Sequence, residues 1–118
     1  MTDPAAPEAI AVVLTNVPDA QTGERIARAL VAERLVACAN VLAPCASIYR
    51  WQGAMEESIE VPVLFKTRAG LLEALSRRIA ELHPYEVPEI IAWHPQHVAP
   101  DYARWVRGET APGEGVDA

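Results

Sequence analysis

Two kinds of apolar pattern alternate along this chain, one typical of buried strands and the other of amphipathic helices. The β-branched, apolar run at 10–17 is typical of a strand buried in a sheet. The next stretch, from 21 to about 34, repeats apolar residues every three to four positions, which predicts an amphipathic helix. A second stretch with this period, at about 70–82, predicts another helix, and His83-Pro84 ends it.

Between the two helices the pattern predicts a long hairpin. Residues 38–42 and 47–51 have strand composition, and Pro44 between them implies a kink or bulge within one long strand. Gly53 marks a turn, and the segment 59–67 returns as the partner strand. Such a hairpin is unusually long for a chain of 118 residues.

The last two predicted elements are a strand at 89–93 and a short helix at 100–106. The order is therefore β-α-β-β-α-β with an added C-terminal helix, the split β-α-β, ferredoxin-like pattern of an α+β sandwich with an antiparallel sheet. Two helices then cover one face of the sheet, and the other face meets water or another subunit. We expect one domain at 9–107 and flexible tails at 1–8 and 108–118, because both ends are rich in Pro, Gly, Ala and acidic residues.

Composition limits the kinds of partner. The net charge of −6 and the pI near 5.0 argue against nucleic acid, which requires a basic face. No apolar run approaches the ~20 residues of a membrane span, and the N-terminus lacks the positive charge of a signal peptide. We therefore expect a cytoplasmic protein with no membrane partner. Cys38 and Cys45 are too few for a disulfide framework, which favours two reduced, buried thiols.

Alternation within the hairpin indicates which side chains share a face. If Gly53-Ala54 is a two-residue turn, Gln52 pairs with Met55 and the rest of the register follows. One face then carries an apolar row suited to packing under helices, namely Ile59, Val61, Val63 and Phe65. The opposite face carries Tyr49, Trp51, Glu60, Leu64 and Lys66. Aromatic and charged groups together indicate an interface or a pocket; the alternative is ordinary surface charges beside cross-strand aromatic pairs.

The densest cluster of candidate functional residues begins at His83. From chemistry alone, His83 at the end of a helix is a terminal residue favoured by the helix dipole. Pro84 and Pro88 bracket an extended segment that could hold Tyr85 and Glu89 rigidly beside a cavity. The pattern leaves both interpretations open.

Other candidate chemistry is weaker. His94 and His97 have two residues between them, but two ligands alone are a poor indication of a metal site. Walker, G-x-G-x-x-G, H-E-x-x-H and G-x-S-x-G motifs are absent. An acylphosphatase-type reaction on this fold calls for an arginine-lined loop after the first strand, where this chain has Asp19 and no Arg. The sequence leaves nucleophilic catalysis by Ser, His and Asp open, although Ser47, Ser58 and Ser76 have no recognisable nucleophile context.

Several segments in the same order and spacing resemble the CutA family. They are VVLTNVPDAQTGERIARALVAERLVACAN, SIYRWQG, an E-x5-KT pattern from Glu60 to Thr67, HPYEVPEI and DYARW. Together they cover about residues 11–106, and HPYEVPEI is the most specific. The resemblance implies a ferredoxin-like protomer in a homotrimer, a link to divalent-metal tolerance with copper as the foremost ion, and no enzymatic activity. No organic cofactor is expected.

Site residues follow from the resemblance by position. Cys38 and His83 match the residues associated with metal. The set that matches the polar and aromatic lining of an inter-subunit cavity is Tyr49, Trp51, Glu60, Lys66, Tyr85 and Glu89. Cys45, His94 and His97 depart from the family pattern, so Cys45 receives no role and any site at the two histidines would be peculiar to this chain. A small anionic ligand in the clefts between subunits is the alternative to a divalent cation. The assembly also resembles that of PII signalling proteins, which makes a sensor or interaction protein that binds a small molecule the alternative function, with metal binding incidental.

Overall fold

A computed structural model describes residues 7–111 of the chain. Its elements are β1 (Ile10–Val17), α1 (Ala20–Ala32), β2 (Cys38–Val41), β3 (Cys45–Trp51), β4 (Ala54–Arg68), the 3-10 turn η1 (Ala69–Leu71), α2 (Leu72–Leu82), β5 (Ile91–Trp93) and α3 (Pro100–Glu109). All of the predicted strands and helices are present, and the bounds of β1 coincide with the predicted run at 10–17.

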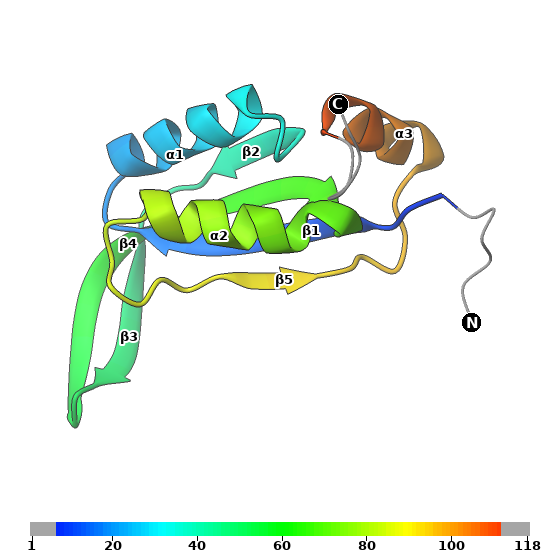
Figure 1. Cartoon of the computed structure of the whole chain (residues 1–118). Helices are drawn as coiled ribbons and strands as arrows, with labels where there is room; N and C mark the ends of the chain where they lie inside the picture. The colour runs from blue at the N-terminus through cyan, green and yellow to red at the C-terminus, as the bar shows by residue number, and fades with distance from the viewer. Residues whose placement is uncertain (1–6, 112–118) are drawn as a thin grey trace.

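The sheet is antiparallel with the strand order β2-β4-β1-β5, and β3 pairs with the far end of β4. This is the predicted ferredoxin-like arrangement, in which β2 and β3 are two parts of one interrupted strand. Helices α1 and α2 lie on one face of the sheet, and the β3–β4 hairpin projects away from it (Figure 1). At the other end of the sheet, α3 packs against β1 and β4.

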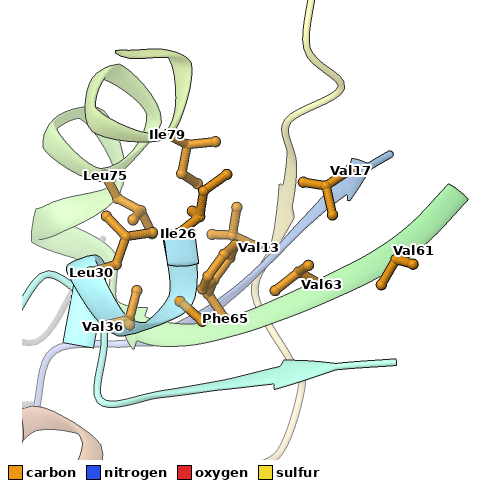
Figure 2. Packing of buried hydrophobic residues seen from close by; sticks show 11 residues of the cluster. Val13, Val17, Ile26, Leu30, Val36, Val61, Val63, Phe65, Leu75 and Ile79 are labelled. Carbon is orange, nitrogen blue, oxygen red and sulfur yellow. The ribbon is translucent and has the colours of Figure 1, made fainter. Parts of the chain in front are cut away.

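The core lies between the sheet and the two covering helices. Figure 2 shows Val13 of β1 and Phe65 of β4 directed toward Ile26 and Leu30 of α1 and Leu75 of α2. All five side chains are at most 1% exposed. Burying a side chain of this size contributes about 1.5–3 kcal/mol relative to leaving it in water, so this layer fixes where the sheet ends and the hairpin begins.

Helix α1 begins at a side-chain cap and lies close to the sheet. Asp19 Oδ1 accepts a hydrogen bond of 2.7 Å from the backbone N–H of Thr22, and this bond lowers the pKa of the Asp19 carboxyl. One turn into the helix, a Cβ added at Gly23 would lie 3.1 Å from Val63 Cγ2 and 3.3 Å from Val41 Cγ1. A side chain at position 23 would therefore crowd these valine methyl groups, which would have to shift by a few tenths of an ångström.

The hairpin turn differs from the predicted one by a single residue. Trp51 pairs with Ala54, and the turn residues Gln52 and Gly53 have φ values of 50° and 82°. Positive φ at both central residues is the signature of the tight type I′ turn. The predicted Gly53-Ala54 turn was wrong, but the correction moves each cross-strand partner by two positions, and side chains two apart share a face. The predicted faces are therefore preserved.

The predicted packing of the apolar row holds only where the helices reach. Val61, Val63 and Phe65 are buried, whereas Ile59 is 63% exposed. Strand β1 ends with the pair Val17–Val61, so β4 residues before Val61 have no helix-covered sheet beside them. The expectation that Ile59 packs under the helices was wrong for this reason.

The interruption between β2 and β3 is a one-residue bulge, as Pro44 predicted. Val41 pairs with Val63, and Cys45 pairs with Glu60. The segment from β2 to β3 therefore advances by four residues while β4 advances by three. One unmatched residue exchanges the two faces of the strand. Odd-numbered residues of β2 thus face the helices, whereas Tyr49 and the other odd-numbered residues of β3 share a face with Glu60.

Contacts of the fold continue past the predicted domain limit at 107. Arg34, with a φ of 60°, donates to the carbonyl oxygens of Gly108 and Glu109 at 3.0 and 3.2 Å. Arg68 bonds to the carbonyl oxygens of Thr110 and Ala111 and forms an ion pair with Glu8 at 3.4 Å. The remainder of the two predicted tails lies outside the described residues. Among the described helices, none is long and apolar enough to cross a membrane.

Candidate ligand cleft

A cleft of 690 Å³ lies where the hairpin leaves the sheet. One wall comes from β3 and β4, and the other comes from the loop between α2 and β5, which passes beside the base of the hairpin (Figure 1). The lining residues are Asn16, Ser47, Ile48, Tyr49, Trp51, Ser58, Glu60, Tyr85, Glu86, Val87 and Glu89. Five of the six side chains that the resemblance placed in a cavity are in this set; Lys66 is not.

The aromatic wall is a product of the bulge and the tight turn. Tyr49 and Trp51 stand two residues apart on β3 and remain exposed. The hydroxyl of Tyr49 lies 3.3 Å from Ser58 Oγ on the neighbouring strand, which fixes the direction of the ring. Two aromatic rings on one face of the hairpin give the cleft an apolar wall, and burying these rings against a ligand would be favourable.

The two walls are joined by a hydrogen bond between side chains. Tyr85 Oη, from the loop, donates to Glu60 Oε2, on β4, at 3.1 Å. Burial, followed by this bond to the carboxylate, raises the pKa of Tyr85 to about 12. The phenol therefore stays protonated near neutral pH and acts as a donor, while Glu60 keeps its second oxygen for another partner.

His83 holds the start of the loop. The ring is 7% exposed, Nε2 lies 2.7 Å from the carbonyl oxygen of Asn16, and Nδ1 accepts from the backbone N–H of Tyr85 at 3.1 Å. The carbonyl is only an acceptor, so the proton sits on Nε2 and the imidazole is neutral. Burial lowers the pKa of His83, against smaller opposing effects of the Asn16 bond and the Glu60 charge. His83 is the C-cap of α2, the terminal position expected from the sequence, but its ring is buried and neutral and so brings no positive charge to the helix dipole.

Glu89 closes the far end of the loop. Its Oε1 accepts from Asn16 Nδ2 at 3.4 Å, a long bond that leaves the carboxylate exposed. Asn16 thus contacts both ends of the loop, through its backbone carbonyl at His83 and through its side chain at Glu89. The two ends of the loop are anchored on a single residue of β1.

Lys66 lies away from the cleft. Its ammonium donates to Asn40 Oδ1, and its cross-strand partners are Val12 and Cys38. Six residues of β4 separate it from Glu60, a distance of about 20 Å at 3.3 Å per residue. Within one chain the cleft therefore has carboxylates and no ammonium or guanidinium group among its lining residues.

Cys38 and His83 do not meet within one chain. Cys38 pairs with Lys66, whereas His83 bonds to Asn16, whose partner on β4 is Pro62, so about 13 Å of strand separates the two positions. Cys38 Sγ instead lies 3.4 Å from Tyr102 Oη, and this contact raises the pKa of Tyr102 to about 12. Residues 7–111 contain no group of three His, Cys, Asp or Glu side chains placed to hold a metal ion.

The remaining candidates are distributed over the surface. Both cysteines are free thiols, as expected, but Cys38 is only half-buried and Cys45 is exposed, so the expectation that both are buried was wrong. Cys45 belongs to the projecting hairpin, where no second layer covers it. His94 Nδ1 lies 3.2 Å from the carbonyl oxygen of Ile10, and His97 is exposed.

Sequence reasoning did not assign several lining residues to the cleft. Ser47 lies two residues from Tyr49, and Ser58 lies two residues from Glu60, so all four share one face of the hairpin. The strand register could therefore have placed both serines in the cleft. No sequence signal placed Asn16, because its contribution depends on how α2 returns the chain to the end of β1.

Comparisons with known proteins show the family of this chain. A family model described as "CutA1 divalent ion tolerance protein" matches residues 11–109. The chain belongs to the CutA1 family. A CutA1 relative from Pyrococcus horikoshii, named divalent-cation tolerance protein CutA, is 44% identical over 84% of this chain and 96% of its own length. A relative of the same name from Thermus thermophilus is 43% identical over the same share of both chains.

Solved CutA1 structures have the same fold. The crystal structure of CutA1 from Ehrlichia chaffeensis covers 91% of this chain and 100% of its own with a TM-score of 0.85 and 28% identity. These CutA1 relatives are named as tolerance proteins and not as enzymes. Two plant relatives, from Arabidopsis thaliana and rice, carry names that include "chloroplastic". A role related to divalent-ion tolerance is therefore established at the level of the family.

Proposed function

We propose that this protein acts in the cytoplasm as a homotrimer that binds a divalent cation, copper first, and so contributes to metal tolerance or to the response to metal. It acts by binding and not by catalysis. Family membership supports the divalent-ion role. The observation that supports the trimer is a set of large apolar side chains that are exposed to solvent in a single chain.

These side chains lie on the hairpin and on the sheet face opposite the helices. Ile48, Met55 and Ile59 on the hairpin are 67%, 75% and 63% exposed, and Ile91 and Trp93 of β5 are also exposed. Exposed apolar groups that follow one ribbon and one sheet face are typical of a surface that another protein covers. Other copies of the chain are the occupant we propose, because cyclic assemblies bury the same patch on every subunit.

Assembly also supplies what a single chain lacks for metal binding. Imidazole nitrogen and thiolate sulfur suit copper, and Cu²⁺ heads the affinity order of divalent ions. Cys38 and His83 are the proposed ligands, each with partners from neighbouring chains. His83 must release either the Asn16 carbonyl or the Tyr85 N–H to bind an ion, so we expect moderate affinity.

Native mass spectrometry of the untreated protein, followed by calorimetric titration with Cu²⁺, tests this proposal. We expect the mass of three chains, and copper binding that is lost in Cys38→Ser and His83→Ala and retained in His94→Ala/His97→Ala. A monomeric mass would contradict the assembly. Loss of binding only in the double variant would place the metal at the loop histidines instead.

A second function is favoured by the size and lining of the cleft. A volume of 690 Å³ lined by three aromatic rings is far larger than a bare ion requires and lies in the range of small-molecule sites. In this alternative the trimer is a PII-like sensor of a small molecule, and metal binding is incidental. An organic molecule retained in the native spectrum, without metal, would favour it.

A further inference from the structure

We infer that Arg34 is a positioning residue for Cys38: its guanidinium holds α3 over the start of β2, and α3 in turn places the phenol of Tyr102 on the Cys38 thiol. Cys38 is one of the two proposed metal ligands, so this role rests on the proposed function and adds to it the control of access to the sulfur. All of the contacts involved are made within one chain.

The backbone of Arg34 is the first observation. Helix α1 ends with two hydrogen bonds, from the N–H of Leu35 to the carbonyl oxygen of Leu30 and from the N–H of Arg34 to that of Val31. In this arrangement the left-handed residue after the helix is usually glycine. Arg34 occupies it with a φ of 60°, which is unfavourable for a residue with a side chain. An arginine is expected at such a position where its side chain makes contacts that glycine lacks.

The guanidinium of Arg34 binds the C-terminal end of α3. Nη2 donates to the carbonyl oxygen of Gly108 at 3.0 Å, and Nε donates to that of Glu109 at 3.2 Å. Positive charge is favourable there, because the last carbonyls of a helix lack partners within it and form the negative end of its dipole. The carbonyl oxygen of Arg34 also accepts from the N–H of Ala111 at 2.8 Å. The end of α1 and the end of α3 are thus joined through one residue.

Helix α3 lies over the residues that begin β2. Ala103 and Val106 of α3 share a buried cluster with Ala37, the residue that precedes Cys38. This cluster is small and separate from the core under α1 and α2 (Figure 1). Elements with a small apolar anchor open locally at a lower free energy than the core does. The hydrogen bonds from Arg34 are therefore a substantial part of what this chain contributes to holding α3 in place.

Tyr102 connects α3 to the thiol. Its Oη lies 3.4 Å from Cys38 Sγ, and its ring packs against Trp105 with centroids 5.7 Å apart. The hydrogen bond with Cys38, followed by burial, raises the pKa of Tyr102 to about 12, so the phenol stays protonated near neutral pH. A reagent or an ion that approaches Sγ from this side must displace the phenol, and the phenol moves with α3. Arg34 thus acts on the thiol through α3.

The rate at which the full-length, metal-free protein reacts with iodoacetamide tests this inference. Cys45→Ser is the background, because it leaves Cys38 as the only thiol of the chain. We expect Arg34→Gly to raise the rate at Cys38 and the amide exchange of α3 by about tenfold, the equivalent of one charge-assisted hydrogen bond. The thermal midpoint should change little, because glycine relieves the left-handed strain. Arg34→Lys, which keeps the charge without the planar fork, should give an intermediate rate.

Arg28→Ala is the matched control, because Arg28 is an exposed arginine of α1. Its rate should stay within twofold of the background, whereas Tyr102→Ala should accelerate the reaction at least as much as Arg34→Gly does. Equal rates in Arg34→Gly and Arg28→Ala would overturn the inference. So would a Cys38 that already reacts as fast in the native background as in urea, or an equal rise of exchange in β1 and β4. Failure of Cu²⁺ to bind would count against the proposed function alone, because the thiol rates are measured without metal.

Discussion

The phenol of Tyr85 and the carboxylate of Glu60 join the 83–89 loop directly to strand β4 through one hydrogen bond of 3.1 Å. We expect Tyr85→Phe to lower the free energy of unfolding by about 1 kcal/mol and to increase hydrogen exchange in the 83–89 loop. Tyr102→Phe, which removes a hydroxyl contact at Cys38, is the control and should leave that loop unchanged. Equal exchange in both variants would show that the loop is held by other contacts.

Stability should fall as acid protonates His83. Its pKa is lowered in the folded protein, so the folded state favours the neutral ring. The stabilisation is complete above the unfolded value of about 6.5 and is lost as the pH falls toward the lower folded value. Thermal unfolding between pH 7.5 and 5 measures this slope. His94→Ala/His97→Ala should keep it and His83→Gln should reduce it; an unchanged slope in His83→Gln would assign the effect to other groups.

Gly53 and Gly108 should respond differently to replacement by alanine. Nothing lies within 4 Å of a Cβ added at either Gly53 or Gly108, but only Gly53 has a left-handed φ, of +82°. We expect Gly53→Ala to destabilise the hairpin by about 1–2 kcal/mol, and Gly108→Ala to be neutral or slightly stabilising within α3. Hydrogen exchange of hairpin amides and urea unfolding measure the two effects. Similar results for both would mean that the turn relaxes to another type.

Removing apolar surface from the hairpin should weaken the assembly and leave the protomer folded. Ile59→Ser changes an exposed side chain that has no part in the buried core. If other chains cover it, the loss of about 1.5–3 kcal/mol per buried side chain should raise the dissociation constant by at least tenfold. Sedimentation over a range of concentrations measures this, with circular dichroism as the check on folding. Val31→Ser, on α1, is the control; equal dissociation in both would argue against the hairpin as the interface.

Local patterns predicted the elements of this fold because each depends on nearby residues. The run at 10–17 became β1 with the same bounds, and the helix-facing row Val61, Val63 and Phe65 is buried as alternation required. The end of the helix-covered sheet was not predictable in this way. Ile59 continues the same alternation, yet it lies past the last residue of β1.

In the cleft, too, alternation predicted which side chains share a face but not where they lie along the strand. Tyr49, Trp51 and Glu60 share a face by alternation alone, so the hairpin wall could be predicted even with the turn misplaced by one residue. Lys66 obeys the same alternation but lies six residues farther along the strand, and a face does not specify a position along it. Of the two ring partners of His83, Tyr85 is local, but Asn16 is 67 residues away, so neither the burial of the ring nor its neutral state could be predicted from nearby residues.

The unmatched residue between β2 and β3 has a consequence for how this segment tolerates changes in length. Deleting one residue at 42–44 would restore a continuous ladder and turn Tyr49 and Trp51 to the side now occupied by Ile48 and Arg50. Deleting or inserting two would keep every hairpin side chain on its present side. A change of the segment length by an odd number of residues therefore reverses the faces of the hairpin strand, whereas an even change preserves them. Natural variation in the length of this segment should occur in steps of two.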